Sequence, residues 1–499
     1  MEETTMELTT MIGQRICTGF TGTEVTDEIR DLVKKHKVGN ILLFSRNVVN
    51  FDQLRTLCKD LSDLILSETG LPPFIMIDEE CGAVSRIGHL AGDTPCAGAL
   101  GSTGDPENAR TVGRIIGKRL RAAGINLNLA PVLDCLSQPR STVMGNRCFS
   151  ESPDEVARFG KSYIEGIRES GILSCGKHFP GHGDTAVDSH FALPVVDKSL
   201  PALEQTELVS FREAIRSGLE SIMTAHIVFP ALDPDLPATI SPLIQQGLLR
   251  QRLGFEGLVI SDGMEMQAMQ NLFPLPEGVF RALQAGIDIV LVCHEPNQAA
   301  AACERVLAAV EQGKMAPEDL EEHFSRIQRF KQALPSPGSK KEFSDSLDRK
   351  LSSEIMDRAV RVLHAPNGSP LPEVNQDTLF WARSSRRASP AMDSSTLNAA
   401  AYAAARIGST LVFTGTEPLP ESRPATAVFF LEKGDHLQDD LAEASRLASL
   451  GTQTILVGLD TAFVLESAPP NTWHIAAWQY QTLALDAVLR MLKQRGAEQ

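Results

Sequence analysis

The chain has 499 residues, of which 42% are hydrophobic and 22% charged, and its formal net charge is −16. This length exceeds what one hydrophobic core usually supports, so we expect two domains, and the composition leaves little room for long disorder. The acidic balance disfavours a nucleic acid or an anionic membrane as partner, because binding phosphates requires a dense basic face. No run of residues is long and apolar enough to suggest a membrane span.

The N-terminal residues and the cysteines favour a cytoplasmic location. Residues 1–11 carry Glu2, Glu3 and Glu7, which a signal peptide would not have. Nine cysteines, an odd number, are scattered between Cys17 and Cys303 without a CxxC spacing. This usage is typical of a reduced compartment and disfavours disulfide frameworks and cysteine-bound zinc.

Short β-rich runs alternate with amphipathic helical stretches as far as about residue 335, which predicts a parallel α/β fold. Eight strands are expected in chain order, and the first rests on the weakest pattern. They cover residues 16–20, 38–44, 74–78, 125–129, 172–176, 221–224, 258–261 and 287–292. Between the fourth and fifth strands we expect a helix that Ser152 caps with a capping box and that ends at Gly171.

Polar side chains recur just after these predicted strands. Examples are Asp78, Asp134, Lys177, His226 and Asp262. In a (β/α)8 barrel the carboxyl ends of the strands converge on one face, so these side chains would meet there. We therefore predict that the first domain is a (β/α)8 TIM-type barrel with its site on that face.

A second, smaller domain is expected after a linker rich in proline, glycine and serine. We assign the barrel to residues 1–335, the linker to 336–349 and the C-terminal domain to 350–499. Buried strands are predicted at 379–382, 427–431 and 454–458, between helices that include 396–407 and 482–493. This order favours a three-layer α/β sandwich.

Three histidines, two aspartates and one lysine fall within the fourteen residues 177–190. Ionisable groups are costly to bury unless they are paired, so this density indicates a substrate-facing loop. Within it, Asp188 and His190 are spaced so that the carboxylate can orient the imidazole for acid/base work. A single such pair is more often a hydrogen-bonded loop feature, but the crowded surroundings favour chemistry.

Asp262 and the histidines of the loop leave several chemistries open. From its position alone, Asp262 could attack an electrophilic carbon, bind a metal or cap the next helix. His178, His182, Asp184 and His190 are suitable metal ligands, but there is no HExxH motif, and Lys177 would place a positive charge beside the ion. We expect no metal and no cofactor.

The run from Lys177 to His190, followed by Phe-Ala-Leu-Pro, closely resembles the signature of glycoside hydrolase family 3. The resemblance is to the branch of β-N-acetylglucosaminidases that act on peptidoglycan fragments. Further matching segments, in the order of the family, are 38–47, 78–86, 130–134, 145–147, 223–226 and 261–262. The chain departs from the family at Cys81, Gly82 and Ala83, where two glycines and an arginine are usual.

The resemblance implies a retaining double displacement. Asp262 would be the nucleophile, and His190, influenced by Asp188, would protonate the leaving oxygen. The residues that would bind the sugar are Asp78, Arg86, Arg147, Lys177 and His178.

The resulting hypothesis is a cytoplasmic exo-β-N-acetylglucosaminidase that removes terminal β-linked N-acetylglucosamine from peptidoglycan-derived fragments. Its partner would be a small carbohydrate, an N-acetylglucosaminide or a muropeptide fragment. The sequence does not indicate an oligomeric state. The alternatives are a β-glucosidase or β-xylosidase, a glycosyl phosphorylase of the same family, and a sugar-binding protein without turnover.

Overall fold

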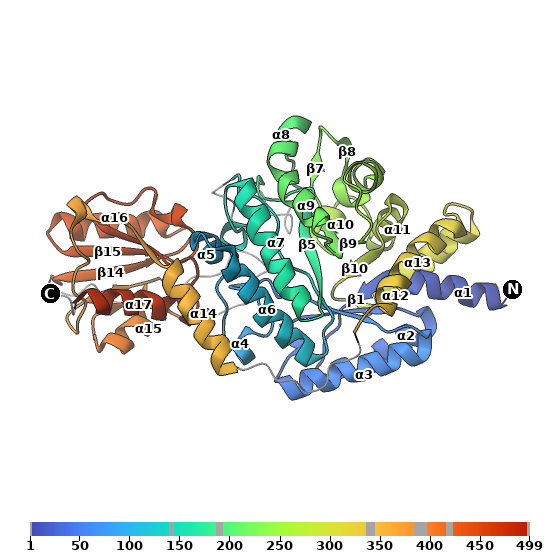
Figure 1. Cartoon of the computed structure of the whole chain (residues 1–499), viewed down its shortest axis with the longest axis horizontal. Helices are drawn as coiled ribbons and strands as arrows, with labels where there is room; N and C mark the ends of the chain where they lie inside the picture. Colours follow the sequence, from blue (N-terminus) through green and yellow to red (C-terminus); the bar gives the residue numbers. More distant parts are fainter. Residues whose placement is uncertain are drawn as a thin grey trace.

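The computed structural model describes residues 2–138, 141, 144–185, 193–335, 345–383, 397–415 and 423–496. Two sheets organise it, a closed barrel in the N-terminal part and a six-stranded open sheet in the C-terminal part. In Figure 1 the open sheet lies at one end of the molecule, beyond α5 (Ala97–Ser102) and α14 (Asp345–Ala359). The expected barrel and sandwich are both confirmed.

Eight parallel strands close the barrel, in the order β1-β2-β3-β4-β5-β6-β9-β10 and back to β1. All eight predicted strands are present, including the first, with bounds that shift by a few residues. They are β1 (Ile16–Thr18), β2 (Asn40–Leu43), β3 (Phe74–Ile77), β4 (Leu127–Asn128), β5 (Leu173–Phe179), β6 (Ser221–Thr224), β9 (Leu258–Gly263) and β10 (Ile289–Val292). Large apolar side chains, among them Leu42, Phe74, Met76 and Leu127, fill the inside of the barrel.

Helices surround the barrel and bury their apolar faces against it. The main ones are α1 (Glu2–Gly13), α2 (Asp27–His36), α3 (Phe51–Thr69), α6 (Pro106–Ala123), α7 (Pro153–Glu169), α9 (Glu207–Arg216), α11 (Leu275–Ala285), α12 (Pro296–Glu311) and α13 (Pro317–Gln332). Shorter ones are α4 (Gly88–Ala91), α8 (Leu200–Gln205) and α10 (Gln267–Gln270). A hairpin, β7 (Val228–Phe229) and β8 (Asp233–Pro237), and a π-helix, Leu243–Arg252, lie between β6 and β9.

Helix α7 has the apolar face that its sequence predicts, but it begins differently. Val156, Phe159, Tyr163 and Ile167 are all fully buried. The expected capping box is wrong, because the side chain of Ser152 makes no capping hydrogen bond to the described residues of the helix. Pro153 at the first helical position presets the backbone there, so the helix starts without the side-chain cap.

The C-terminal domain is a three-layer α/β sandwich, as expected. Its strand order is β11-β16-β15-β14-β12-β13, and only β11 is antiparallel to its neighbour. The strands are β11 (Arg361–His364), β12 (Leu379–Trp381), β13 (Val412–Phe413), β14 (Thr426–Leu431), β15 (Gln453–Gly458) and β16 (Trp473–Ala476). Helix α16 (Leu437–Ser449) covers one face of the sheet, and α14, α15 (Ala399–Ile407) and α17 (Thr482–Gly496) cover the other.

The predicted linker, 336–349, is partly helical. Residues 345–349 form the first turn of α14, whose buried residues include Asp348 and Ser352, while 336–344 lie outside the described residues. Helix α14 packs against α5 and α6 of the barrel. The division of the chain at 335 and 350 stays a prediction.

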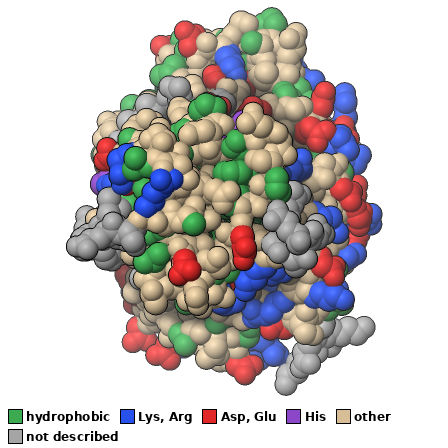
Figure 2. Space-filling model, turned by 90° about the vertical axis from the view of Figure 1, so that its left-hand side faces the viewer, with side chains coloured by type: hydrophobic (Ala, Val, Ile, Leu, Met, Phe, Trp, Pro, Cys, Tyr) green, Lys and Arg blue, Asp and Glu red, His purple; other side chains and the backbone are tan. Residues whose placement is uncertain are grey.

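The surface of the C-terminal end carries both signs of charge. Figure 2 views the molecule from this end and shows acidic and basic side chains interspersed among apolar and neutral groups. Within the described ranges, no helix combines the length and the apolar character needed to cross a bilayer.

Candidate active site

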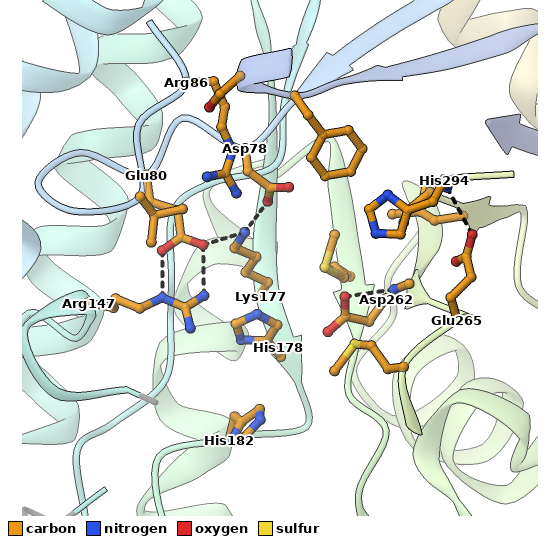
Figure 3. A pocket seen from close by; sticks show the side chains of 18 of the residues that line it. Asp78, Glu80, Arg86, Arg147, Lys177, His178, His182, Asp262, Glu265 and His294 are labelled. Atoms are coloured by element: carbon orange, nitrogen blue, oxygen red, sulfur yellow. Dashed lines mark hydrogen bonds and ion pairs between the residues drawn. The ribbon is translucent and has the colours of Figure 1, made fainter. Parts of the chain in front are cut away.

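A cavity of about 480 Å³ opens at the carboxyl end of the barrel strands (Figure 3). Six of the residues expected to form the site line it: Asp78, Arg86, Arg147, Lys177, His178 and Asp262. They lie at the ends of β5 and β9 or in the connections after β3 and β4, and the barrel brings them together because parallel strands converge on one face. The other two, Asp188 and His190, lie outside the described residues.

Carboxylates and cations alternate along one side of the cavity. The Lys177 Nζ donates to Asp78 Oδ1 at 2.6 Å and lies 2.5 Å from Glu80 Oε1. Arg147 binds both oxygens of Glu80, from Nε and Nη2, at 2.8 Å each. Glu80 thus bridges the two cations. The result is a charged cluster that holds its own side chains in place and consists of Asp78, Lys177, Glu80 and Arg147.

The charges of this cluster are fixed by their mutual contacts. Burial alone would raise the pKa of Glu80, but Arg147 and Lys177 outweigh it and hold that pKa well below its usual range. Burial would likewise lower the pKa of Lys177, but Asp78 and Glu80 raise it above its ordinary value. Both groups are therefore ionised at neutral pH. Glu80 stands only two residues after Asp78, but no pattern in the sequence distinguishes it as a site residue.

The loop after Asp78 is shaped by Glu79. Its carboxylate accepts hydrogen bonds from the Ser85 hydroxyl at 2.6 Å and from the Arg86 and Ile87 backbone N–H at 2.7 and 3.3 Å. These bonds fold the loop back so that Arg86 reaches the cavity. Burial raises the pKa of Glu79 to about 7, against the opposing effect of the three donors.

The departure from the family pattern at Cys81 lies in this loop. Cys81 has φ +87° and Gly82 has φ +58°, both in the left-handed region that favours glycine. A Cβ at Gly82 would lie 2.3 Å from Cys96 Cβ, so only glycine fits there. Cys81 itself is buried and pairs with Val84 in an isolated bridge, which holds its unusual backbone in place.

A buried carboxylate orients two histidines behind the cluster. Asp134, fully buried, accepts the backbone N–H and Nδ1 of His178, the latter at 2.8 Å, and the backbone N–H of His182 at 2.6 Å. Since Nδ1 of His178 is held, Nε2 is the nitrogen that remains for a ligand in the cavity. Burial and the neighbouring His178 lower the pKa of His182 to about 4. His182 is therefore neutral at physiological pH.

Asp262 lies on the opposite side of the cavity from this cluster (Figure 3). It belongs to the end of β9, and its Oδ1 accepts the Gly263 N–H at 2.7 Å. His226, buried after β6, contacts the Gly263 carbonyl oxygen through Nε2 at 3.0 Å and Thr239 Oγ1 through Nδ1 at 2.8 Å. The helix-capping alternative for Asp262 is wrong, because the next helix, α10, starts only at Gln267.

The remaining wall combines apolar and polar groups that follow β2, β9 and β10. The rings of Phe44 and His294 lie 5.1 Å apart, and the Arg46 guanidinium lies 4.2 Å from the Phe44 ring centroid. Arg46 donates to the carbonyl oxygens of Phe20 and Cys293, so it ties the first and last strands of the barrel together. Glu265 accepts the backbone N–H of His294 at 3.0 Å.

The donor set of the cavity does not resemble a metal centre. Among the described residues, no group of three or more His, Cys, Asp or Glu side chains is arranged to hold an ion. His178 and Asp134 are instead bound to each other, and Lys177 occupies the space between Asp78 and Glu80.

A parallel barrel with carboxylates and cations around one cavity at its carboxyl face defines an enzyme that binds a small polar molecule. Residues 2–330 match the model of the glycosyl hydrolase family 3 N-terminal domain. The chain belongs to glycosyl hydrolase family 3, and its curated relatives identify it as a glycoside hydrolase of the beta-hexosaminidase type.

A beta-hexosaminidase of Alkalilimnicola ehrlichii is 38% identical over 285 residues, which are 56% of this chain and 80% of that protein. A family 3 beta-N-acetylglucosaminidase structure from a Paenibacillus species superposes with a TM-score of 0.89 at 30% identity, covering 98% of this chain and 97% of the other. The NagZ structure from Neisseria gonorrhoeae, in complex with N-trifluoroacetyl-D-glucosamine, has a TM-score of 0.54 at 31% identity. It covers 65% of this chain and 98% of its own.

Proposed function

We propose that the protein is a retaining exo-β-N-acetylglucosaminidase that works by double displacement, with Asp262 as the nucleophile. The observation that carries this proposal is the position of Asp262, across a single cavity from the cluster of Asp78, Lys177, Glu80 and Arg147. A sugar ring bound by the cluster would turn its anomeric carbon toward a carboxylate that is already aligned at a strand end. This is the arrangement that formation of a glycosyl-enzyme requires.

The cluster suits a sugar because it offers fixed hydrogen-bonding groups of both kinds. Asp78 can accept hydrogen bonds from hydroxyl groups, and Arg86, Arg147 and Lys177 can donate to them, with His178 Nε2 as a further partner. Because Asp78, Lys177, Arg147 and His178 are already paired in the absence of a sugar, little of the site must reorganise on binding. The sugar-binding assignments of Asp78, Arg86, Arg147, Lys177 and His178 are part of this proposal.

We assign the proton donor to His190, oriented by Asp188. The described part of their loop supports this, since Lys177, His178 and His182 all line the cavity. An imidazole can replace the usual second carboxyl group because its pKa lies near neutrality, so that it can both give and take the proton.

The names of the relatives support the acetamido sugar, whereas the peptidoglycan origin of the substrate is inferred from the family resemblance of residues 177–190. The curated relatives are named beta-hexosaminidases, and one solved relative holds an N-acylated glucosamine. A cytoplasmic location fits the cysteines, since the structure describes all nine and each is a free thiol. A soluble fragment of peptidoglycan is then the substrate that the enzyme would meet.

The nucleophile and the sugar can be tested together with chromogenic substrates. We expect the wild-type enzyme to prefer an aryl β-N-acetylglucosaminide over the matching β-glucoside, and to release N-acetylglucosamine from a disaccharide with N-acetylmuramic acid. Asp262→Asn should lose about three orders of magnitude or more in kcat on the aryl substrate. Asp235→Asn, at an exposed site outside the cavity, serves as the matched control and should keep wild-type rates.

Rescue by azide tests the role of Asp262 as nucleophile more directly. A small variant, Asp262→Ala, should regain activity with added azide and form an α-glycosyl azide, because azide attacks from the face that the carboxylate left. Comparable rates in wild type and Asp262→Asn would remove Asp262 as the nucleophile. A preference for the β-glucoside would retain the chemistry but overturn the acetamido specificity.

The acid/base role can be tested through the leaving group. His190→Ala should slow substrates with poor leaving groups, such as alkyl glycosides, much more than it slows activated aryl glycosides, which depart without a proton. The measurement is kcat/KM across a series of leaving-group pKa values. Equal losses across the series would contradict a proton donor at this position.

A further inference from the structure

The short segment Gly145–Arg147 lies between the two domains. On the barrel side, Arg147 reaches into the cavity and binds Glu80 with both ends of its guanidinium. On the other side, the segment contacts residues that follow three neighbouring parallel strands of the C-terminal sheet, β14, β15 and β16. The carboxyl edge of that sheet therefore faces the loop Gly145–Arg147, which carries a residue of the cavity.

Lys433, just after β14, makes the first of these contacts. Its Nζ donates to the Ser141 carbonyl oxygen at 2.8 Å and lies 3.4 Å from Asp460 Oδ2, which follows β15. The same Nζ lies 2.7 Å from the position that a Cβ on Gly145 would take, with the Thr461 side chain at 3.4 Å. The lysine side chain is only 15% exposed, so it is enclosed between the two domains.

Trp478, just after β16, makes the second contact. Its carbonyl oxygen accepts the side-chain N–H of Asn146 at 2.7 Å, and its indole Nε1 donates to the Ala359 carbonyl at 3.0 Å. The backbone of Trp478 has φ +68°, a conformation that non-glycine residues rarely adopt. Its ring packs over Gly98, where an added Cβ would lie 3.3 Å from the indole. This strained backbone directs the carbonyl to Asn146, the immediate neighbour of Arg147.

Taken together, these contacts hold both sides of the residue that binds Glu80. Asn146 is 2% exposed and Arg147 is 7% exposed, so neither can move without disturbing the domain interface. We propose that Lys433 and the Trp478 carbonyl are positioning groups for the cavity: they fix Ser141 and the loop Gly145–Arg147, and with them the Arg147 side chain, in the geometry that binds the sugar. This inference rests on the proposed function, because it deepens the role given there to Arg147.

The contacts can be removed one at a time. Lys433→Met keeps the aliphatic stem but removes both the hydrogen bond to Ser141 and the ion pair with Asp460. Loss of one charged hydrogen bond at a positioning site should raise KM for the aryl N-acetylglucosaminide by about five- to tenfold and change kcat much less. Lys433→Arg keeps a donor and a charge and should restore KM to near the wild-type value. Asn146→Ala tests the same support from the barrel side and should also raise KM.

Arg358→Met is the matched control. Arg358 of α14 donates to Asn108 Oδ1 of α6 at 2.7 Å, so this variant also removes a hydrogen bond between the domains, but away from the loop. Its KM should equal that of wild type. Hydrogen exchange of a peptide covering residues 144–150, measured by mass spectrometry, should be faster in Lys433→Met than in wild type or Arg358→Met.

The KM values and exchange rates of these variants separate the inference from its alternatives. Unchanged KM and unchanged exchange in Lys433→Met and Asn146→Ala would overturn the inference. An equal rise of KM in Arg358→Met would also overturn it, because the effect would then belong to the interface as a whole. Faster exchange in Lys433→Met, in a protein whose wild type cleaves none of the aryl glycosides, would leave the loop support intact and reject the proposed function instead.

Discussion

Glu79 and Glu80 are adjacent in the sequence, but the structure gives their carboxylates opposite surroundings. Glu79 accepts hydrogen bonds from a hydroxyl and two backbone N–H groups, and burial raises its pKa to about 7. Glu80 is equally buried but meets Arg147 and Lys177, and these cations keep it ionised. One carboxyl group therefore shapes the loop while its neighbour neutralises the cations of the cavity.

This difference predicts that Glu80→Gln is far more harmful than Glu79→Gln. Removing the charge of Glu80 leaves two buried cations without their shared partner, which typically costs about 3 kcal/mol or more of stability. The variant should unfold at a lower temperature and bind the sugar more weakly, as measured by calorimetry and by KM.

Glu79→Gln is the matched control for that experiment. At pH 6 the Glu79 carboxyl group is mainly protonated, since its pKa is about 7, so an uncharged amide of the same shape should change the melting temperature little. Equal losses in the two variants at pH 6 would contradict the roles assigned to these neighbours.

At the scale of elements, the strands were predictable and several connections were not. Short apolar runs mark the barrel strands, most weakly the first, because the strands are buried on both faces. The π-helix Leu243–Arg252 and the hairpin of β7 and β8 carry no comparable sequence signal, since their shape depends on packing against the rest of the barrel.

The residues of the site likewise divide into those that the sequence predicts and those that it does not. Side chains at strand ends, such as Asp78, Lys177 and Asp262, were predictable because the barrel fixes where strand ends meet. Glu80 was not, because a glutamate in the acidic run after Asp78 reads as a solvated charge. Its burial depends on Arg147 and Lys177, which lie 67 and 97 positions further along the chain.

One helix of the barrel carries a pH-sensitive contact. Lys331 of α13 is 1% exposed, and its Nζ donates to Gln14 Oε1 at 2.6 Å and to the Gly39 carbonyl oxygen at 2.8 Å. Burial lowers the pKa of this ammonium from 10.5 to about 7. Between these two values the unfolded chain binds more protons than the folded one at this residue, so its contribution to stability rises with pH.

Lys331→Met should remove that dependence. As the pH rises from 7 to 9, the wild type should gain stability relative to the variant, by at most about 1.4 kcal/mol per pH unit. The difference in melting temperature between the two proteins at pH 7, 8 and 9 measures this gain. Lys314→Met, at an exposed position, should show a difference that does not change with pH. A constant difference for Lys331→Met as well would show that the amine does not lose its proton in the folded protein.

At the scale of the whole molecule, the two-domain architecture could be predicted but the contact between the domains could not. The helix and strand patterns of the two parts are local, and each part forms most of its own core, although Ile355 packs in a barrel cluster and Cys96 and Ala99 pack in the C-terminal one. The contacts of Lys433 with Ser141 and of Trp478 with Asn146 join residues that are 292 and 332 positions apart in the sequence. No periodicity in a single sequence encodes how two finished surfaces dock.

The carboxyl edge of the C-terminal sheet has a consequence for how this protein can be divided. In open α/β sheets, that edge is the usual place for a ligand. Here β14, β15 and β16 turn it toward the barrel, where Lys433 contacts Ser141 and Asp460, and Trp478 contacts Asn146. A protein truncated to the barrel would keep every side chain proposed to contact the sugar. It would lose the contacts of the C-terminal domain with the loop that carries Arg147, so this side chain would be less well fixed when the sugar binds. The barrel alone carries the side chains proposed to bind the sugar, but both domains are needed to hold them in position.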